Sequence, residues 1–195
     1  MSANLRTSTP HHYTLEEYFA LEKVGDARYE YWDGELFCMS GGSKKHYRLS
    51  SRIHILLSNK VDENGCETFT GDIPIKTPKL PPYRYPDAAV VCGEAQFENM
   101  QGLDVLVNPV LIVEVLSPTT EAVDREEKRK AYQAIDSLRE YLLIAQDKFA
   151  VTRYSKIGDI WNREIFSELD SIVLLPSINE ELSLRELYRG IPLSD

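Results

Sequence analysis

Two carboxylates stand inside apolar, β-branched segments of this 195-residue chain. Asp87 follows Pro86 in the segment 84–91 (RYPDAAVV), and Glu114 interrupts the segment 110–116 (VLIVEVL). Burying a carboxylate costs free energy, and two carboxylates on neighbouring strands also repel each other. A divalent cation would offset both costs, and Mg²⁺ accepts an incomplete set of hard oxygen ligands from the protein. The pair therefore predicts a magnesium site.

Such an ion polarises a phosphoryl oxygen and lowers the pKa of its bound water, as phosphodiester hydrolysis requires. The chain has no GxSxG, P-loop, HExxH or GxGxxG motif that would indicate another chemistry. The competing interpretation is structural: Asp87 caps a turn, and Glu114 pairs with a basic residue in the core. We favour the metal site, because a carboxylate inside Leu-Ile-Val-Glu-Val-Leu is costly to bury for structure alone.

The N-terminal half predicts two helices around a hairpin. Thr14 and Glu17 form a capping box, and Asp33-Gly34 is a hairpin turn signal inside the segment 29–40. Ser43 can cap a helix to about Asp62 that buries one face, formed by Leu49, Ile53, Leu56, Leu57 and Val61. A histidine beside that face, such as His46, is more often a hydrogen-bonded boundary residue than a catalyst.

Short strands and two further helices follow. We expect strands at 66–70, 73–76, 84–91, 109–116, 139–145, 149–156, 159–167 and 172–175, with a polar, weakly ordered connection over 93–108. A helix from Thr119 or Thr120 to about Ser137 would place Asp124, Lys128 and Tyr132 on one side. A short helix over 182–188 carries a second capping box, Ser183 with Glu186. This order predicts an α/β fold with a mixed β-sheet flanked by helices.

Composition excludes global disorder and bulk attraction to polyanions. The chain is 43% hydrophobic and 27% charged, with a formal net charge of -9. Any nucleic-acid surface must therefore be a local basic patch. Three clusters could form one, although solvated surface is the ordinary interpretation of each: Lys44, Lys45, Arg48 and Arg52; Lys76, Lys79 and Arg84; and Arg125, Lys128, Arg129 and Lys130.

The cysteine and hydropathy patterns predict a cytoplasmic protein. Cys38, Cys66 and Cys92 are widely spaced and form no CxxC motif, so we expect small, buried, reduced side chains. There is no targeting pattern or apolar run of membrane-spanning length. Residues 1–12 are expected to form a flexible arm, and residues 13–195 a single nuclease-like domain.

Several motifs together resemble a known family. YEYWDGEL, RYPDAAVV, LIVEVLSPTT with a following D-x-x-x-K-x-x-x-Y helix, and REYLLI occur in the matching order. Together they resemble the Uma family of presumed restriction endonucleases, within the PD-(D/E)XK nuclease superfamily. The resemblance covers residues 13 to 187. It implies a restriction-endonuclease-like fold and Mg²⁺-dependent cleavage of DNA, with Mn²⁺ as a possible substitute.

The resemblance assigns roles residue by residue. Asp87 and Glu114 match the acidic metal ligands, Glu30 matches an additional upstream acid that also ligates, and His46 matches a histidine without a clear role. The superfamily's lysine two residues after the glutamate is Leu116 here. We therefore predict that Lys128 supplies the cation that orients water or stabilises charge on the phosphate, with Lys76 as the alternative.

The sequence thus predicts a Mg²⁺-dependent endonuclease that cuts DNA. The alternative is a catalytically silent nuclease-fold domain that binds nucleic acid or protein, since Leu116 departs from the signature. A third possibility is a metal-dependent phosphoesterase for small substrates. A single domain of this size would need two copies for a double-strand break, so we expect a homodimer, without membrane association.

Overall fold

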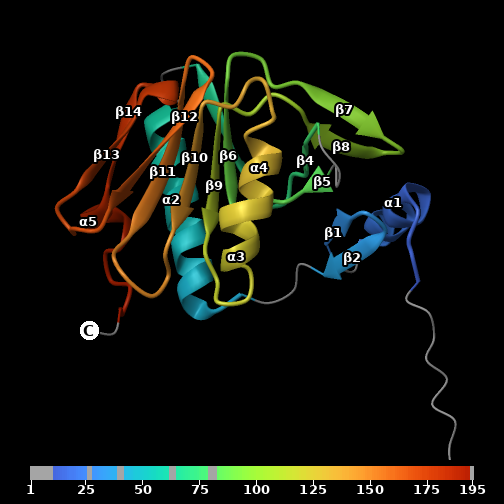
Figure 1. Cartoon of the computed structure of the whole chain (residues 1–195), viewed down its shortest axis with the longest axis horizontal. Coiled ribbons are helices and arrows are strands. Elements are labelled where there is room, and N and C mark those ends of the chain that lie inside the picture. Colours follow the sequence, from blue (N-terminus) through green and yellow to red (C-terminus); the bar gives the residue numbers. More distant parts are fainter. Residues whose placement is uncertain (1–10, 26–27, 39–41, 62–64, 79–82, 194–195) are drawn as a thin grey trace, which may run out of the picture.

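The computed structural model describes residues 11–25, 28–38, 42–61, 65–78 and 83–193 (Figure 1). Its centre is a six-stranded mixed sheet in the order β12-β11-β10-β9-β6-β3, where β9 and β10 are parallel and the other neighbours antiparallel. These strands are β3 (Cys66–Thr70), β6 (Ala88–Cys92), β9 (Leu111–Val115), β10 (Glu140–Ile144), β11 (Val151–Ile157) and β12 (Ile160–Phe166). The predicted α/β class with a mixed sheet is confirmed.

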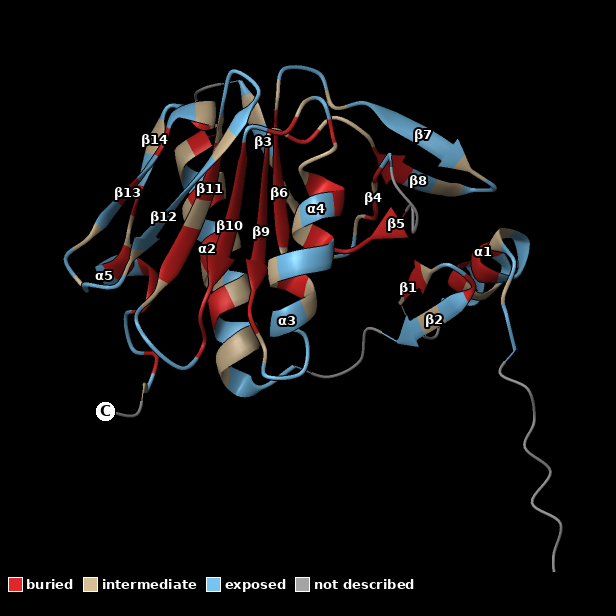
Figure 2. Cartoon of the chain, in the orientation of Figure 1, coloured by how far each residue is buried: buried red, intermediate tan, exposed pale blue. Residues whose placement is uncertain are grey.

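Helices cover both faces of this sheet. Helix α2 (Lys44–Val61) packs on one face, and a helical connection between β9 and β10 packs on the other (Figure 1). Because strand side chains alternate, Val113 belongs to the cluster under α2, whereas Ile112 belongs to the opposite cluster. Figure 2 shows β6, β9 and β10 as the buried middle of the molecule. The sheet thus presents one row of β9, which includes Glu114, to the β9–β10 connection.

A second six-stranded sheet lies beside the first, in the order β2-β1-β5-β4-β8-β7. Its strands are β1 (Tyr29–Trp32), β2 (Glu35–Cys38), β4 (Ile75–Lys76), β5 (Tyr83–Arg84), β7 (Phe97–Met100) and β8 (Leu103–Leu106). Helix α1 (Leu15–Val24) packs against it and begins with the predicted capping box of Thr14 and Glu17. The hairpin around Asp33-Gly34 is confirmed over residues 29–38. This sheet brings Glu30 toward the central sheet.

The C-terminal segment adds a small third sheet. Strand β13 (Ile172–Leu175) pairs with β14 (Glu180–Ser183), with a 3-10 turn η2 (Pro176–Ile178) between them. Helix α5 (Leu184–Leu187) follows and is shorter than predicted; the Ser183 side chain accepts a hydrogen bond from the Glu186 amide. Residues 1–10 of the predicted arm, and the predicted strand residues 39–40, lie outside the described residues. The predicted domain bounds stay a prediction.

The segment 84–91 was predicted to be one strand, and this prediction is wrong. It divides into β5, in the second sheet, and β6, in the central sheet, with Pro86 and Asp87 between them. Proline has no amide hydrogen to donate to a ladder, so pairing stops there and the chain can change sheets. Asp87 therefore lies at the junction of the two sheets.

Two other predictions also require correction. The expected polar connection over 93–108 contains the β7–β8 hairpin, with Gln101 and Gly102 in the left-handed conformation at its turn. Val105 and Leu106 are fully buried, which stabilises a hairpin whose polar residues Glu98, Asn99 and Asp104 would not predict it. The helix expected to reach Ser137 ends at Tyr132 instead. It consists of α3 (Glu121–Val123), a π-helical turn η1 (Asp124–Lys128) and α4 (Arg129–Tyr132).

The predicted state of the cysteines is wrong. Cys66 and Cys92 are opposite residues on β3 and β6 and form a disulfide, while Cys38 is free and exposed. The sequence could not show this pairing, because it depends on the register of two strands separated by 26 residues. The disulfide closes one end of the β3–β6 pair.

Replacing Cys66 and Cys92 together by alanine should lower the free energy of unfolding of the oxidised protein by about 3 kcal/mol, since the loop that they close is of intermediate length. Chemical denaturation with and without dithiothreitol measures this effect. The control is Cys38→Ala, which should respond to dithiothreitol like the wild type. Equal stability of the oxidised and reduced wild type would contradict the prediction.

Candidate active site

Lys128 is the centre of a buried cluster of charged side chains. Its Nζ lies 2.8 Å from Oε1 of Glu30, 3.2 Å from Oε1 of Glu114 and 3.4 Å from Oδ1 of Asp124. These three carboxylates come from β1, β9 and η1, so one ammonium group joins both large sheets to the helical connection. Only 6% of the Lys128 side chain is exposed. The cluster is therefore shielded from bulk water, and its charges interact strongly.

Glu114 is held on the face of β9 that the helical connection covers. Lys128 and the hydroxyl of Tyr132, at 3.0 Å, both donate to its Oε1. Lys128 and Tyr132 are four residues apart, at the end of the π-helical turn and the end of α4. Such π-helical turns recur at functional sites, and this one brings Asp124 and Lys128 inward together. The predicted sharing of one side by Asp124, Lys128 and Tyr132 is confirmed, since all three are buried.

Asp87 lies opposite Glu114 at the end of the β6–β9 ladder. Ala88 pairs with Val113 in an antiparallel register, which continues to Asp87 and Glu114. The amide of Val115 donates to Oδ2 of Asp87 at 2.7 Å, so the side chain bonds the backbone where Pro86 has ended strand pairing. Asp87 is thereby fixed beside Glu114 through the backbone of β9.

His46 contacts Asp87 from the first turns of α2. Its Nε2 lies 3.4 Å from Oδ1 of Asp87, and this hydrogen bond raises the pKa of His46 while partial burial opposes the rise. Gly42 makes room for the imidazole, because a Cβ there would lie 2.9 Å from Nδ1. Gly71 is equally tight, since its Cβ would lie 2.9 Å from the carbonyl oxygen of Pro86. The exposed fractions are 21% for the His46 side chain and 13% for that of Asp87, so the cluster meets solvent here.

Glu30 is held from both sides. Its Oε1 contacts Lys128 and accepts a hydrogen bond from the Tyr85 amide, while its Oε2 accepts one from Trp32 Nε1 at 3.2 Å. Arg84 lies 3.7 Å from the same Oε2, and its guanidinium stacks 3.7 Å above the Trp32 ring. Arg84 is 1% exposed, contrary to its interpretation as solvated surface. It supplies a second buried positive charge.

The electrostatics follow from burial and crowding. Burial raises the pKa of Glu114 well above its ordinary value; Lys128 opposes this shift, and Asp124, Asp87 and Glu30 add to it. The pKa of Asp124 is raised for the same reasons. Burial disfavours the charged form of Lys128, but the field of the surrounding carboxylates is stronger and raises its pKa well above the usual value. Lys128 is therefore a permanent cation.

The residues present fit a divalent cation. If all four carboxylates of Glu30, Asp87, Glu114 and Asp124 are ionised and His46 is neutral, the two cations Lys128 and Arg84 leave a formal surplus of 4 - 2 = 2 negative charges. Oδ1 of Asp124 is buried beside Lys128, with which it forms the 3.4 Å ion pair, and all donors to Glu114 among the described residues use Oε1.

Within the described ranges, no three His, Cys, Asp or Glu residues form a ready-made metal cluster. Magnesium, however, is commonly held by one or two carboxylates, with water and substrate phosphate completing its shell. Asp87 and Glu114 are the pair that matches this pattern.

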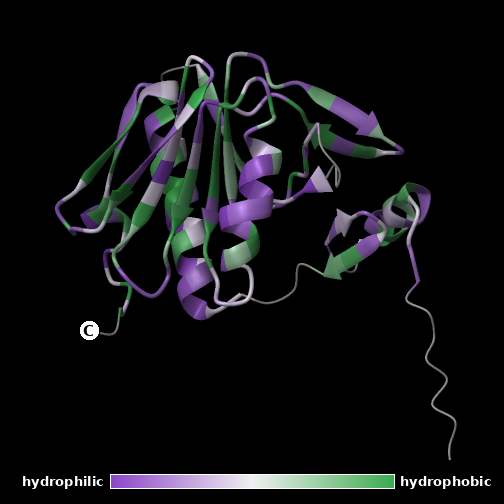
Figure 3. Cartoon of the chain, in the orientation of Figure 1, coloured by the Kyte–Doolittle hydropathy of each residue, from purple (hydrophilic) through white to green (hydrophobic). Residues whose placement is uncertain are grey.

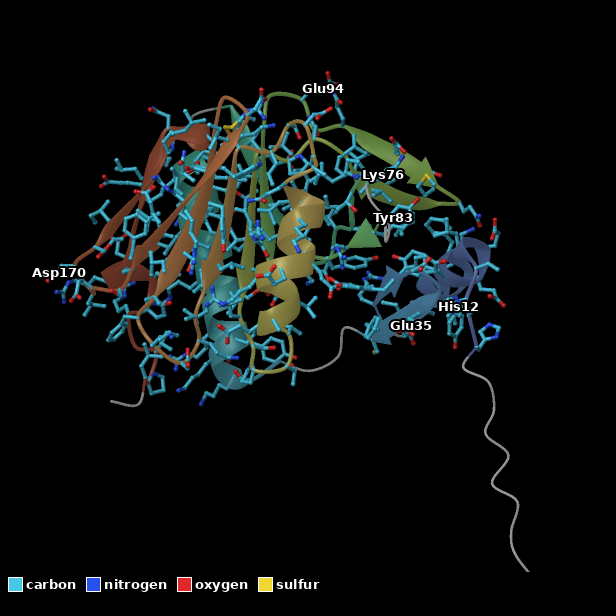
Figure 4. The ribbon with its side chains drawn as sticks, in the orientation of Figure 1. His12, Glu35, Lys76, Tyr83, Glu94 and Asp170 are labelled. Carbon is cyan, nitrogen blue, oxygen red and sulfur yellow. A yellow bond between two sulfur atoms is a disulfide. The ribbon has the colours of Figure 1, made fainter. Side chains whose placement is uncertain are left out.

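The structure brings together four of the residues that the sequence selected. Glu30 and Glu114 both contact Lys128, and Asp87 lies opposite Glu114. The alternative lysine, Lys76, instead pairs with Glu98 at 2.5 Å, and Figure 4 shows it beside Tyr83 in the second sheet. Leu116 is buried in the apolar cluster on the face of β9 that carries Glu114. Sequence reasoning assigned no role in the site to Arg84, Asp124 or Tyr132, although the spacing of the last two was a usable signal.

Comparison with known proteins shows the family to which the chain belongs. Residues 15–187 match the model of the Uma2 family, described as "Putative restriction endonuclease", and the chain belongs to this family. Two uncharacterized proteins of Synechocystis sp. (strain ATCC 27184 / PCC 6803 / Kazusa) are similar. One, slr1290, is 33% identical over 180 residues, covering 90% of this chain and 91% of the relative. The other, sll1609, is 34% identical over 146 residues, covering 75% and 82%.

A solved structure shares the fold. The crystal structure of a "putative nuclease belonging to DUF820" from Anabaena variabilis ATCC 29413 aligns with a TM-score of 0.73 and 20% identity, over 92% of this chain and 99% of that one. None of the helices in the described ranges is both long and apolar enough to cross a membrane.

Replacing Lys128 by methionine should lower the free energy of unfolding by about 3 kcal/mol, because the buried carboxylates lose their shared counter-ion. The double variant Lys128→Met with Glu30→Gln should lose less free energy of unfolding than the two single variants lose in sum. The coupling free energy should be about 1 to 3 kcal/mol. Urea denaturation of the four proteins measures the cycle. Lys130→Met, at an exposed lysine paired with Glu126, is the control and should change little. Strict additivity of the two changes would contradict the described cluster.

Proposed function

We propose that this protein is a Mg²⁺-dependent endonuclease that hydrolyses phosphodiester bonds in DNA. The observation that carries the proposal is the convergence of Glu30, Glu114 and Lys128 in direct contact, with Asp87 opposite Glu114 at the solvent edge of the same cluster. Membership of a family described as restriction endonucleases supports the choice of DNA.

In this proposal Asp87 and Glu114 hold the metal ion, which when bound would activate water and neutralise phosphate charge. The Val115 amide fixes the orientation of Asp87, and Tyr132 fixes that of Glu114. Lys128 keeps its proton, so it acts as a positive hydrogen-bond donor to water or phosphate and not as a base. His46 orients the second oxygen of Asp87.

We infer that Glu30 acts mainly by positioning Lys128. Both of its oxygens already have partners in Lys128, the Tyr85 amide and Trp32. A direct bond from Glu30 to the metal, as the sequence predicts, would require Lys128 to move away from that carboxylate. The contacts therefore favour Asp87 and Glu114 as the principal ligands.

The competing proposal is a catalytically silent domain that binds nucleic acid or protein. The specific observation in its favour is that Lys128 is fully engaged by three carboxylates, which is also what a purely structural ion network would show. A catalytic lysine must release at least one of these partners when metal and phosphate enter. Metal-dependent cleavage distinguishes the two proposals.

Asp87→Asn and Glu114→Gln should each lower the rate of plasmid cleavage at least about 100-fold in Mg²⁺ or Mn²⁺, since each removes a negative charge while preserving shape. Conversion of supercoiled to open-circular and linear DNA measures the rate, and circular dichroism confirms folding. Lys76→Met is the matched control for the competing lysine and should cut like the wild type. Cleavage that persists in both carboxylate variants would exclude the proposed metal site.

We further infer that residues 13–195 act as one cytoplasmic nuclease domain and that two copies associate, because one site cuts one strand at a time. In that compartment the Cys66–Cys92 disulfide would be exposed to thiols that can reduce it.

Sedimentation equilibrium should show a dimer at the protein concentrations that yield linear DNA. A strictly monomeric protein that produces linear DNA in a single encounter would contradict the dimer.

A further inference from the structure

All the Lys, Arg, Asp and Glu residues of helix α2 are basic, whereas the chain as a whole is acidic. The α2 sequence, KKHYRLSSRIHILLSNKV, contains five lysines and arginines and no aspartate or glutamate, in a protein whose formal net charge is -9. Lys44 and Lys45 stand in the first turn, where a positive charge opposes the helix dipole and slightly destabilises the helix. Helix stability therefore does not explain these charges.

The exposed side of α2 forms a defined surface, here called the α2 stripe. It consists of residues three and four apart along the helix: Lys44, Tyr47, Arg48, Ser51, Arg52 and Ile55. Tyr47 and Ile55 are 54% and 56% exposed, so apolar surface lies between the cations. Figure 3 shows the N-terminal turns of α2 in the hydrophilic colour.

The charges of the α2 stripe are not neutralised by neighbouring acids. Among the residues that the structure describes, no ion pair within 4.0 Å involves Lys44, Arg48 or Arg52. Arg52 donates to the backbone carbonyls of Glu186 and Arg189, which fixes the guanidinium without cancelling its charge. The same helix buries Leu49 and Ile53 in the core, so it cannot turn its apolar face to a lipid surface. The stripe thus presents positive charge without a neighbouring acid to solvent, and one of its cations, Arg52, is held in place.

The α2 stripe and the candidate active site share the first turns of α2 but use opposite sides of the helix. His46, which contacts Asp87, is two residues from both Lys44 and Arg48 and so lies on the side of Ile53, away from the stripe. From Lys44 to Ile55 the helix rises about 16 Å, the length of roughly five nucleotide steps along one DNA strand. We propose that the α2 stripe binds the phosphate backbone of duplex DNA. This inference rests on the proposed nuclease function for its choice of polyanion.

Duplex binding tests the stripe without requiring cleavage. Lys44→Ala combined with Arg48→Ala should weaken binding of a fluorescein-labelled 25-base-pair duplex at least about 10-fold in EDTA, measured by anisotropy. The slope of log affinity against log salt should fall by about 2, because two fewer phosphates are neutralised by the variant. The matched control is Lys130→Ala with Arg163→Ala, which removes the same charge from α4 and β12. Arg52 is left unchanged because it bonds the C-terminal segment.

Each outcome decides between the alternatives. Equal affinity and salt slope for the stripe and control variants would overturn the inference, while metal-dependent cleavage by the wild type would leave the proposed function intact. Stripe-dependent duplex binding by a wild type that cuts no DNA would support the stripe and refute the nuclease. Failure of the wild type to bind duplex DNA would overturn the inference. It would also be overturned if the stripe variant lost binding to poly-L-glutamate but bound duplex DNA as tightly as the wild type.

Discussion

The ammonium group of Lys128 is the interaction on which the site depends. It lies within 3.4 Å of carboxylates from β1, β9 and η1, and the most distant of these in sequence, Glu30, is 98 residues from Lys128 (128 - 30). Without it, three carboxylates would be buried at one point with no shared counter-ion, and either protonation or local opening would follow. The helical connection between β9 and β10 delivers this charge, and its π-helical turn lies where Asp124 and Lys128 point inward.

The same cluster explains why the two sheets meet as they do. Pro86 ends one ladder, Asp87 bonds the Val115 amide, and the preceding residues Arg84 and Tyr85 contact Glu30. A single short segment therefore fixes the relation between the hairpin that carries Glu30 and the strand that carries Glu114. The formal surplus of negative charge at this junction destabilises the protein without a metal ion. The same surplus favours the binding of a divalent cation.

Local sequence patterns predicted much of this, and long-range pairing accounts for what they missed. Asp87 and Glu114 were visible because carboxylates are rare in apolar strands, and Lys128 because a helix returning over the sheet can reach Glu114. Arg84 was hidden because a basic residue before Tyr85-Pro86 looks like solvated surface, whereas stacking on Trp32 and pairing with Glu30 allow its burial. The β7–β8 hairpin and the Cys66–Cys92 bond depend on partners that no local window contains. The metal, the substrate and the dimer remain proposals, since they concern molecules other than this chain.

We propose that Asp87, directly before β6, and Glu114, opposite it on β9, bind a divalent cation beside Lys128. A crystal soaked in Mn²⁺ and measured at the manganese absorption edge tests it most directly. The proposed site predicts an anomalous peak bonded to the carboxylates of Asp87 and Glu114, absent from crystals of Glu114→Gln. A well-ordered site with Lys128 still in contact with Glu30 and Glu114, and no anomalous peak at either ligand, would contradict it.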